Sequence, residues 1–572
     1  MGLKILGINY GGHDASACIT NNGQLLAACE QERYDYKKHS RAFPLEAIED
    51  CLKLSNLKMR DIDIISFGAN PKLLVKERYY NLQKQFPERK KFSAKDKKKI
   101  KEFLNLEKTI RKKLNFKKKI DFNLHHLCHL YSTYCPSGFK KSLVVSYDGL
   151  GEIDTALFGI GESNRVRVIH NQNKFPNSLG LFYSAITYYL GWQHHCDEGI
   201  IMGLAPYGNA DAKIKNSKKT FIEIFREIIS TDNNDPLKIK IDLDWIDYHK
   251  KKDTWLSKKF FKCFGKKRLH DQSITKKHKD IAAALQLRLE EIVIMQLKFL
   301  KKKYNIKFLC LSGGVGLNCS LNGKIESQKI FKEIFIQPAS GDSGVAYGTC
   351  LVSTKKHQKN IKFKKNWDFY SGSKLEKNKF LKTLEKKNLT YKKLEKNIFK
   401  DVSKLLAEGK IIGWYQGRTE FGPRALGNRS ILCKPFPKQM RDYVNKHVKF
   451  REYFRPFAPA ILKSHYKEYF EIKQESPHML IATKVKKNKI KKIEATVHVD
   501  GSARVQTVSK ETNLSFWKLL KEFNKLTKVP VLLNTSFNIK GQPIVNKFED
   551  AIGCFLKYNI DYLVIDDYLI SK

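Results

Sequence analysis

Short apolar runs that end at glycine turns dominate the beginning of the chain. The opening LKILGINYGGHDASACITNNGQLLAACEQER predicts a strand, a glycine turn, a second strand, an Asn22-Gly23 hairpin and a third strand. The later stretch KSLVVSYDGLGEIDTALFGIGESNRVRVIH repeats this pattern of an apolar strand, an acidic glycine turn and further strands. A duplicated α/β core with two lobes and a central cleft accounts for both units, with ligands bound where strand ends meet turns.

Longer patterns predict helices between and after these units. Residues 70–118 have the lysine-rich pattern of helices, and DIAAALQLRLEEIVIMQLKFL predicts an apolar helix with Asp280 as its N-cap. FLCLSGGVGLNCS then predicts a buried strand that enters a glycine turn, and GDSGVAYGTCLV predicts a turn aspartate followed by a helix of small residues.

The chain is predicted to form two domains, because 572 residues exceed what one compact core accommodates. The lysine-rich, polar stretch 355–365 is the predicted linker. We therefore expect a first domain over 1–354 and a second α/β domain over 366–572, where helices alternate with short strands such as VPVLLNTSF.

The charge is unusual, since 107 Lys and Arg against 58 Asp and Glu give 107 − 58 = +49. Such a field favours polyanions, including nucleic acid. Most of the excess is lysine in helical-looking segments without an aromatic platform, so compositional bias is favoured over a nucleic-acid surface. The chain has no apolar run of eighteen residues, no signal-peptide pattern and no CxxC, which predicts a cytoplasmic protein without membrane contact.

The stretch HHLCHLYSTY contains a candidate metal site. On a helix His125 and His129 share one face, whereas His126 points elsewhere. Asp148 and Asp342, each after a predicted strand, are candidates for the remaining ligands. Two imidazoles and two carboxylates suit Fe(II), Mn(II) or Zn(II) with positions left for substrate. The alternative is a histidine pair on the surface or in the core.

Two further turns contain candidate chemistry. SGGVGLN, residues 312–318, has glycines that bring backbone N–H groups close to a phosphate or ribose, although it is neither a Walker A loop nor GxGxxG. A tight turn that needs left-handed glycines is the alternative. His13 in GGHDAS is a candidate general base at the cleft, and the alternative is a histidine that only caps the turn.

Arginines on glycine turns beside apolar strands predict an anion site in the second domain. GWYQGRTEFGPRALGNRSIL and VKFREYFRPFAPAIL contain most of these cations, and few acidic residues lie nearby to pair with them. Such a rigid set suits phosphate or carbonyl oxygens better than structural ion pairs. The candidates are Arg418, Arg424, Lys449, Arg455, Arg504 and Asn534.

Ordered motifs along nearly the whole chain resemble the NodU/TobZ-type O-carbamoyltransferases. They include GGHDASA, HHLCHLYS, SYDGLGE, IMGLAPYG, GGVGLNCSLNGKI, GDSG, GRTEFGPRALGNRSIL, REYFRPFAPAIL, VDGSARVQTV and NTSFNIKGQPIV. The resemblance implies an α/β fold with an actin-like (ASKHA) two-lobed N-terminal domain, similar to tRNA threonylcarbamoyl transferases, and a YrdC-like C-terminal domain. It implies that carbamoyl phosphate and ATP form carbamoyl adenylate, whose carbamoyl group then moves to a hydroxyl of a sugar or related small acceptor.

The resemblance also assigns roles to residues. His13 takes the acceptor proton, and the metal, which would be Fe(II), is held by His125, His129, Asp148 and Asp342. The nucleotide is held by Gly313, Gly314, Val315 and Asn318 in the first domain. Carbamoyl phosphate and ATP, with Mg(II), are bound in the second domain by Arg418, Arg424, Lys449, Arg455, Arg504 and Asn534.

The chain departs from the family pattern at one position of a motif. EGIIMGLA replaces EGKVMGLA, so that Ile200 stands at the lysine position, and GWQHHCDEG adds His194, His195 and Cys196. The alternatives are tRNA threonylcarbamoyl-type modification and a catalytically silent nucleic-acid-binding relative. The acceptor and the oligomeric state, including a homodimer, stay open.

Overall fold

Two five-stranded mixed sheets with the same strand order form the N-terminal part of the protein. The computed structural model describes residues 2–89, 92–215, 217–251 and 254–572. One sheet has the order β3-β2-β1-β4-β5, and the other, read in the same direction, β8-β7-β6-β11-β12. Their strands are β1 Lys4–Asn9, β2 Ser16–Asn21, β3 Gln24–Glu30, β4 Ile64–Phe67, β5 Lys119–Phe122, β6 Lys141–Tyr147, β7 Asp154–Glu162, β8 Arg165–Lys174, β11 Phe308–Ser312 and β12 Glu333–Ile336.

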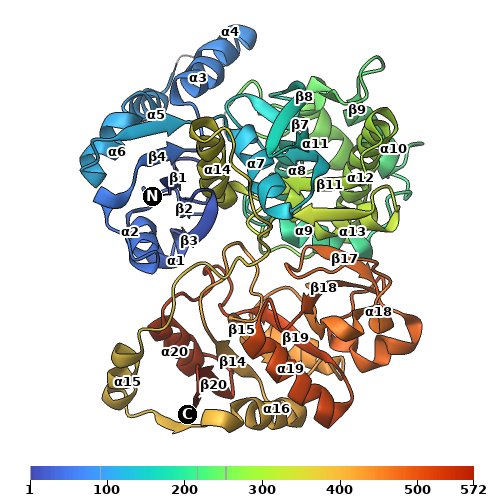
Figure 1. Cartoon of the computed structure of the whole chain (residues 1–572). Helices are drawn as coiled ribbons and strands as arrows, with labels where there is room; N and C mark the ends of the chain where they lie inside the picture. The colour runs from blue at the N-terminus through green and yellow to red at the C-terminus, as the bar shows by residue number, and fades with distance from the viewer. Residues whose placement is uncertain (1, 90–91, 216, 252–253) are drawn as a thin grey trace.

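Both sheets also share the direction of every strand. In each, the first three strands form an antiparallel meander, and two parallel strands extend the far side of the first one. The sequence prediction of a repeated strand–turn–hairpin unit is therefore confirmed. Because the core consists of two such units side by side, the N-terminal part has the actin-like two-lobed fold (Figure 1).

Each of two central helices follows a strand of one sheet but packs on the other sheet. Helix α7 (His125–Ser137) follows β5 of the first sheet but packs on β6, β7 and β11 of the second. Helix α14 (Val345–His357) follows β12 of the second sheet but packs on β1, β2 and β4 of the first. Because α7 and α14 also pack against each other, the residues at their N-termini meet between the lobes (Figure 1).

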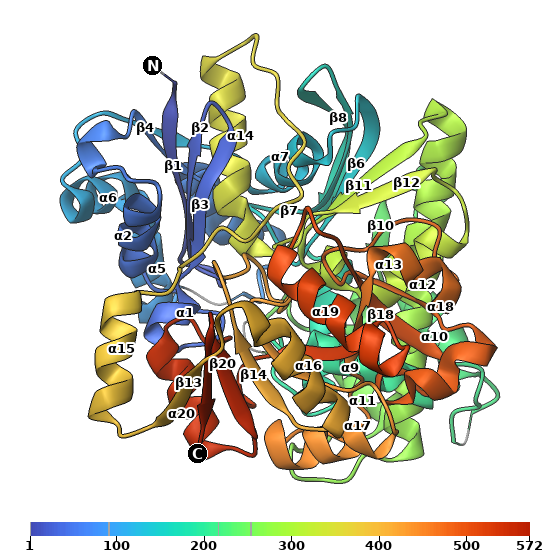
Figure 2. The ribbon, with the colours of Figure 1, turned by 60° about the horizontal axis from the view of Figure 1, so that its bottom comes forward.

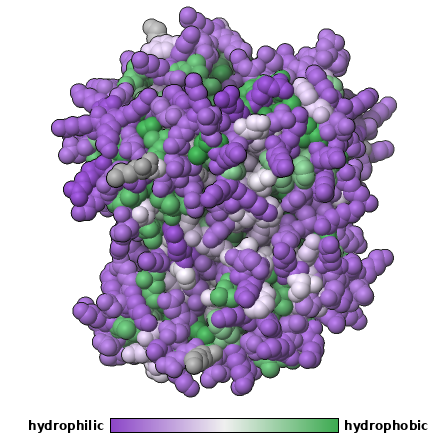
Figure 3. Space-filling model, viewed as in Figure 1, coloured by the Kyte–Doolittle hydropathy of each residue, from purple (hydrophilic) through white to green (hydrophobic). Residues whose placement is uncertain are grey.

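Shorter helices cover the first lobe. The lysine-rich stretch predicted to be helical does form helices, interrupted by the π-helical turn η2 (Lys76–Asn81). The helices of this lobe are α1 Glu32–Asp35, α2 Leu45–Leu54, α3 Pro71–Val75, α4 Leu82–Gln85, α5 Ala94–Leu104 and α6 Leu106–Leu114. The lysines of α5 and α6 are mostly exposed. Hydrophilic residues cover most of the face of the molecule that Figure 3 shows.

A helical insertion enlarges the second lobe. It lies between β8 and β11 and contains the hairpin of β9 (Ile229–Thr231) and β10 (Ile239–Ile241) and the helices α8 Leu179–Tyr189, α9 Glu198–Leu204, α10 Phe221–Ile228, α11 Lys258–Phe264 and α12 Lys276–Tyr304. Helix α13 (Cys319–Ser327) connects β11 to β12.

Helix α12 begins before the predicted position. The prediction of Asp280 as its N-cap is wrong, because Thr275 is the N-cap and forms a capping box with His278. The Asp280 carboxylate instead accepts hydrogen bonds from the Asn209 amide at 2.8 Å and from Lys276 at 2.8 Å.

One nine-stranded mixed sheet forms the C-terminal part, in the order β13-β21-β20-β14-β15-β19-β16-β18-β17. Helices α16 and α19 pack against each other, and α15 and α20 share an apolar cluster with β14, β15 and β20 (Figure 2). The strands are β13 Thr390–Lys393, β14 Ile412–Tyr415, β15 Arg429–Cys433, β16 Ala458–Leu462, β17 Ile481–Lys484, β18 Ser502–Val508, β19 Val531–Ser536, β20 Tyr562–Ile565 and β21 Tyr568–Ser571. The helices are α15 Lys377–Lys386, α16 Ile398–Glu408, α17 Gln439–Tyr443, α18 Tyr466–Tyr469, α19 Leu514–Thr527 and α20 Phe548–Lys557.

The N- and C-terminal parts are joined by an irregular segment and by direct contacts. Residues 358–376 contain no helix or strand, and the first three residues of the predicted linker still belong to α14. Helix α13 packs on β17, and the Asn322 amide donates to the Leu480 carbonyl at 2.9 Å. Within the described ranges, no helix is both long and apolar enough to cross a bilayer.

Candidate functional site

Four predicted metal ligands meet at the centre of the two-lobed part. His125 and His129 lie on the first turns of α7, Asp148 follows β6, and Asp342 lies just before α14. The Nε2 atom of His125 is 3.4 Å from Asp148 Oδ2 and 3.4 Å from Asp342 Oδ1. His129 Nε2 is 3.9 and 3.7 Å from the same two oxygens. The exchange of α7 and α14 between the lobes thus brings residues more than 200 positions apart into one group.

The spacing of these four atoms fits a single metal ion. The two Nε2 atoms lie 3.1 Å apart, and one atom from each residue falls within 4.8 Å of the others. Ligand atoms about 2.1 Å from a tetrahedral ion are separated by roughly 3.4 Å. All four residues are buried, and Asp342 Oδ1 has no hydrogen-bond partner among the described residues. A buried oxygen without a partner in a group of this composition fits a cation, because an uncompensated buried charge is costly.

Burial and opposite charges act against each other in this group. Burial favours a neutral His125, but the carboxylates of Asp342 and Asp148 outweigh it and raise the pKa of His125 well above its usual value. Burial likewise favours a protonated Asp148, but His125 and His129 hold the pKa of this carboxyl well below its usual range. The two acids are therefore ionised and available as ligands.

His126 lies next to these ligands in sequence but not in space. Its Nε2 donates to the Asp154 carbonyl at 3.0 Å, and its Nδ1 accepts from the Ser146 hydroxyl at 3.0 Å. Burial lowers the pKa of His126 to about 3, so the ring is neutral. The structure thus separates the face of His125 and His129 from His126, as the helical spacing predicts.

The candidate base His13 lies beside the group, half-exposed. Its Nδ1 is 2.9 Å from Asp14 Oδ2 and its Nε2 is 3.7 Å from Asp342 Oδ2. His39 Nδ1 contacts the other oxygen of Asp14 at 2.6 Å. Burial favours the neutral ring, but Asp342 and Asp14 raise the pKa of His13 to about 9. A positive charge bound at Asp342 would oppose this effect, so a base role is compatible only with a filled metal group.

The glycine turn after β11 lies directly against Asp148. Gly313 has φ +82°, and a Cβ there would be 2.1 Å from the Tyr147 carbonyl oxygen, so the turn needs a left-handed glycine, while its approach to a phosphate or ribose stays a prediction. The Gly314 amide donates to Asp148 Oδ1 at 2.8 Å. Val315 is buried. The Asn318 side chain caps α13 through the Leu321 amide at 2.9 Å and bonds to Gln286 at 2.9 Å, so its amide is already engaged.

The C-terminal part has a second candidate site made of cations. Arg424, Arg455 and Arg504 are close enough that their charges repel, and burial together with Arg504 and Arg455 lowers the pKa of Arg424. The Nε atoms of Arg424 and Arg504 are buried without partners in the described part of the chain. Glu452, 3.6 Å from Arg455, is an acid beside this cluster. Because one acid does not balance three arginines, the excess positive charge of this cluster favours an anion.

Lys449 and Asn534 lie on strands and turns around these arginines. The Lys449 ammonium donates to the Ser536 and Asn538 carbonyls at 2.7 and 2.6 Å, and burial lowers its pKa well below the usual value. Asn534 Nδ2 donates to Gln506 at 2.8 Å, while its Oδ1 is buried without a partner among the described residues. Both side chains are therefore fixed before any ligand binds.

Arg418 lies where the C-terminal part meets the first lobe. Its Nε and Nη2 donate to the backbone carbonyls of Leu26 in β3, Ser371 and Gly372. Two of its three guanidinium nitrogens are thereby engaged, and its anion-binding role stays a prediction. Arg418 ties the C-terminal part to the first lobe, as does Arg33, which donates to the Gly422 carbonyl at 2.8 Å.

Several site residues were not predicted from the sequence. Glu152 accepts from the His125 amide, and Arg78 bonds to the loop that contains Asp148. Arg451, which stands in a quoted motif, is oriented by Asn445 at 2.7 Å. The only sequence signal for Glu152 is its place in the SYDGLGE motif, and Arg78 lies in a lysine-rich helical stretch where nothing distinguishes it.

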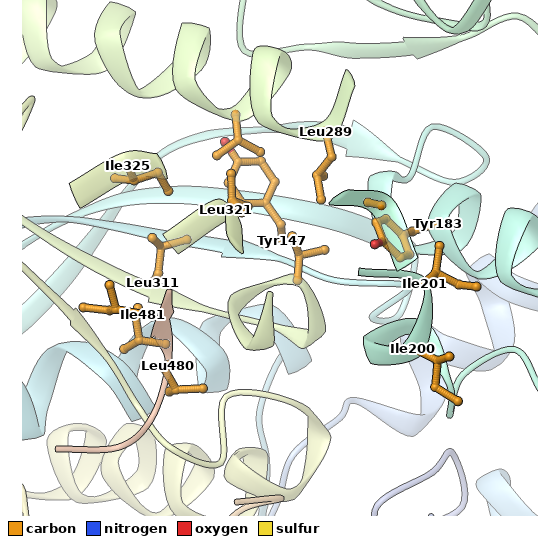
Figure 4. Packing of buried hydrophobic residues seen from close by; sticks show 14 of the residues in the cluster. Tyr147, Tyr183, Ile200, Ile201, Leu289, Leu311, Leu321, Ile325, Leu480 and Ile481 are labelled. Atoms are coloured by element: carbon orange, nitrogen blue, oxygen red, sulfur yellow. The ribbon is translucent and has the colours of Figure 1, made fainter. Parts of the chain in front are cut away.

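Ile200, which stands where the family has a lysine, has apolar surroundings. Ile200 is buried and belongs, with Ile201 and Tyr183, to an apolar cluster that the second lobe shares with the C-terminal part (Figure 4). His195, part of the added stretch, has its ring 5.9 Å from that of His13, and burial lowers its pKa to about 3. A neutral imidazole, that of His195, therefore lies next to the His13 ring.

Comparison with known families decides the relationship. The family model described as carbamoyltransferase N-terminus matches residues 4–351, and the one described as carbamoyltransferase C-terminus matches residues 403–572. The chain belongs to the carbamoyltransferase family. The resemblance to NodU/TobZ-type enzymes is thereby confirmed, and the protein is a transferase of carbamoyl groups in the general sense of that family.

Relatives align along most of their length. Nodulation protein NolNO of Sinorhizobium fredii is 35% identical over 98% of this chain and 79% of its own. Nodulation protein NolO of Bradyrhizobium diazoefficiens is 37% identical over 78% of each chain. A solved structure of HypF from T. kodakarensis aligns with 63% of this chain and 48% of its own at 12% identity and a TM-score of 0.31, which adds nothing to the fold defined by the strand order.

Proposed function

We propose that this carbamoyltransferase forms carbamoyl adenylate from carbamoyl phosphate and ATP, and transfers the carbamoyl group to a hydroxyl of a sugar or related small acceptor. The C-terminal cations would perform the first half-reaction and the central His/Asp group the second. The observation that carries the proposal is the presence of two sites of opposite electrostatic character in one chain of this family.

The cation site suits the adenylation. Water cleaves carbamoyl phosphate to phosphate and carbamate, and a carbamate oxygen then attacks the α-phosphorus of ATP and displaces pyrophosphate. Apart from water, every species in this step is an anion, and the negative charge that develops on the leaving group needs fixed donors. Arg424, Arg455 and Arg504 would provide this positive charge, and the electrostatic repulsion among them would be relieved when an anion binds. A YrdC-like domain over 366–572 and Mg(II) on ATP are part of this proposal.

The central site suits the transfer. The acceptor oxygen attacks the carbamoyl carbon, the bond to the phosphate oxygen breaks, and AMP leaves. His13 has its Nδ1 engaged by Asp14, so Nε2 is the nitrogen that takes the hydroxyl proton. The backbone turn at Gly313 and Gly314 would lie along the nucleotide.

A metal ion fits this site. His125, His129, Asp148 and Asp342 would hold it, with Fe(II) the first candidate, and it would supply positive charge to the phosphate oxygens of the leaving group. The protein's own contribution is to keep these four side chains in place before binding.

Pyrophosphate release with ATP and carbamoyl phosphate tests the adenylation. We expect release from the wild type that requires carbamoyl phosphate, and a loss of at least about tenfold in Arg424→Ala, since a charge-assisted hydrogen bond contributes about 1.5–3 kcal/mol. Arg167→Ala, an exposed arginine on β8 that is not part of either site, is the matched control and should keep full activity. Equal release without carbamoyl phosphate, or an Arg424→Ala protein as active as the control, contradicts the proposal.

The rival reaction, tRNA threonylcarbamoyl-type modification, receives no support from the site geometry. The positive charge of +49 lies largely on exposed lysines outside both sites, such as those of α5 and α6. The small acceptor therefore remains the proposal, and its identity, the compartment and a homodimer stay predictions.

A further inference from the structure

Arg78 makes an unusual set of contacts beside the proposed metal group. It belongs to the π-helical turn η2 of the first lobe. Its Nε donates to the Gly151 carbonyl at 2.8 Å and the Glu152 carbonyl at 3.2 Å, and its Nη2 donates to the Leu150 carbonyl at 2.7 Å and again to Gly151. One guanidinium thus holds three consecutive carbonyls of the loop that begins with the ligand Asp148.

Glu152 links the same loop to the first lobe and to α7, here as a hydrogen-bond acceptor. Its side chain, which is 2% exposed, accepts from the Asn70 amide of the first lobe at 2.8 Å and from the His125 amide at 3.2 Å. His125 is the first residue of α7 and a predicted ligand. The loop also presses against α7, because a Cβ at Gly151 would lie 2.7 Å from His126 Cδ2.

The backbone around Arg78 is shaped for this contact. A π-helical turn inserts extra chain into a helix, so that side chains point in directions that a regular helix cannot provide, and such turns frequently occur at functional sites. The η2 turn follows α3, whose N-cap Asn70 bonds to Glu152 through its own amide. The same short segment of the first lobe thus reaches the loop twice, once through a backbone amide and once through a guanidinium.

We propose that Arg78 and Glu152 are a positioning pair that sets the distance between Asp148 and His125 and so makes the metal group competent to bind. The inference rests on the proposed function, because it assumes that these residues hold a metal. Neither side chain is a ligand. Residues that orient metal ligands from outside typically change metal affinity by about 10- to 100-fold when mutated.

Titration of the full-length, metal-stripped protein with Co(II) tests the pair, since the visible absorption of Co(II) reports both affinity and ligand geometry. We expect Arg78→Ala and Glu152→Gln to weaken Co(II) binding about 10- to 100-fold and to change the spectrum. Arg78→Lys keeps the charge but loses the planar fork, so it should also bind more weakly than the wild type. Lys76→Ala, an exposed lysine on the same π-helical turn, is the matched control and should titrate like the wild type.

Two further readouts separate positioning from loss of fold. The metal-free melting temperature and the carbamoyl-phosphate-dependent pyrophosphate release should change little in Arg78→Lys, since the C-terminal site is untouched. Co(II) affinity and spectrum equal to the wild type in Arg78→Lys and Glu152→Gln would overturn the positioning role. Failure of the wild type to bind Co(II) would contradict the metal assignment, and the positioning role with it, while leaving the adenylation proposal standing.

Discussion

The two candidate sites differ in the sign of the charge that each can bind. The central group brings two histidines and two ionised carboxylates within 4.8 Å, where the carboxylates need a cation. The C-terminal cluster brings Arg424, Arg455 and Arg504 together, where they need an anion. The lesson is that the charge a site lacks indicates its ligand better than the residue types it contains.

The contrast extends to the arginines themselves. Arg429 is fully buried, yet its guanidinium donates to the carbonyls of Gln416, Asn428, Ser373 and Gly417. The Nε atoms of Arg429 and of Arg424, five residues earlier, are both buried without a partner among the described residues, so the difference lies in the terminal nitrogens. Those of Arg429 are engaged by carbonyls and support the fold, whereas the Arg424 guanidinium forms no hydrogen bond to a described residue and is available to a ligand.

Asp342→Asn gives the largest expected effect. Loss of one ligand charge should weaken metal binding by more than about 100-fold, beyond what outer contacts contribute, and should abolish transfer to the acceptor. Pyrophosphate release should persist, because the C-terminal site is intact. Metal content after gel filtration and the half-reaction assay measure the two effects, and loss of both activities together would break the distinction between the sites.

Arg429→Ala should mainly reduce stability, whereas Arg424→Ala should mainly weaken substrate binding. Arg429→Ala removes the hydrogen bonds to four backbone carbonyls, of which those of Asn428 and Ser373 keep a backbone donor, and should lower the free energy of unfolding by about 2–4 kcal/mol. Arg424→Ala removes repulsion and should leave that free energy unchanged or raise it, while the KM for carbamoyl phosphate rises about 10- to 100-fold. Denaturant titration and steady-state kinetics check both, and equal destabilisation would contradict the distinction.

His278, in the first turn of α12, should contribute to the acid sensitivity of the fold. His278 Nδ1 accepts from the Thr275 amide at 3.1 Å, and burial lowers the pKa of His278 to about 4. The unfolded chain takes up this proton near pH 6.5, so the folded state loses stability as the pH falls from 6.5 towards 4, by about 2 kcal/mol at pH 5. His278→Gln should show a flatter pH dependence of the unfolding free energy, and an unchanged slope would exclude His278 as its source.

The sequence predicted the two-lobed fold because its pattern is local. The apolar runs and the Asn22-Gly23 turn identify the strands β1 to β3, and the same signals recur for β6 to β8. The helical spacing of His125 and His129 also predicted which histidines share a face. The N-terminus of α12 was predicted at the wrong residue because its capping box pairs Thr275 with a histidine. The usual sequence signal is Ser or Thr followed three residues later by Glu or Gln.

Other features depend on contacts that no local pattern contains. Arg418 and Arg424 stand in one glycine-rich motif and look alike, yet Arg418 reaches the Leu26 carbonyl nearly 400 residues away. Arg78 is one basic residue among many in its segment, and only the approach of the two lobes makes it special. Tertiary hydrogen bonds, rather than residue type, decide which cation binds a ligand.

Trapping of the intermediate tests the central claim most directly. Wild type, Asp342→Asn and Arg424→Ala would be mixed with ATP labelled at the α-phosphate and with carbamoyl phosphate, without acceptor, and quenched within one turnover. We predict labelled carbamoyl adenylate in the wild type and in Asp342→Asn but not in Arg424→Ala. Adenylate that disappears with Asp342→Asn and persists in Arg424→Ala would contradict the assignment of the two half-reactions to the two sites.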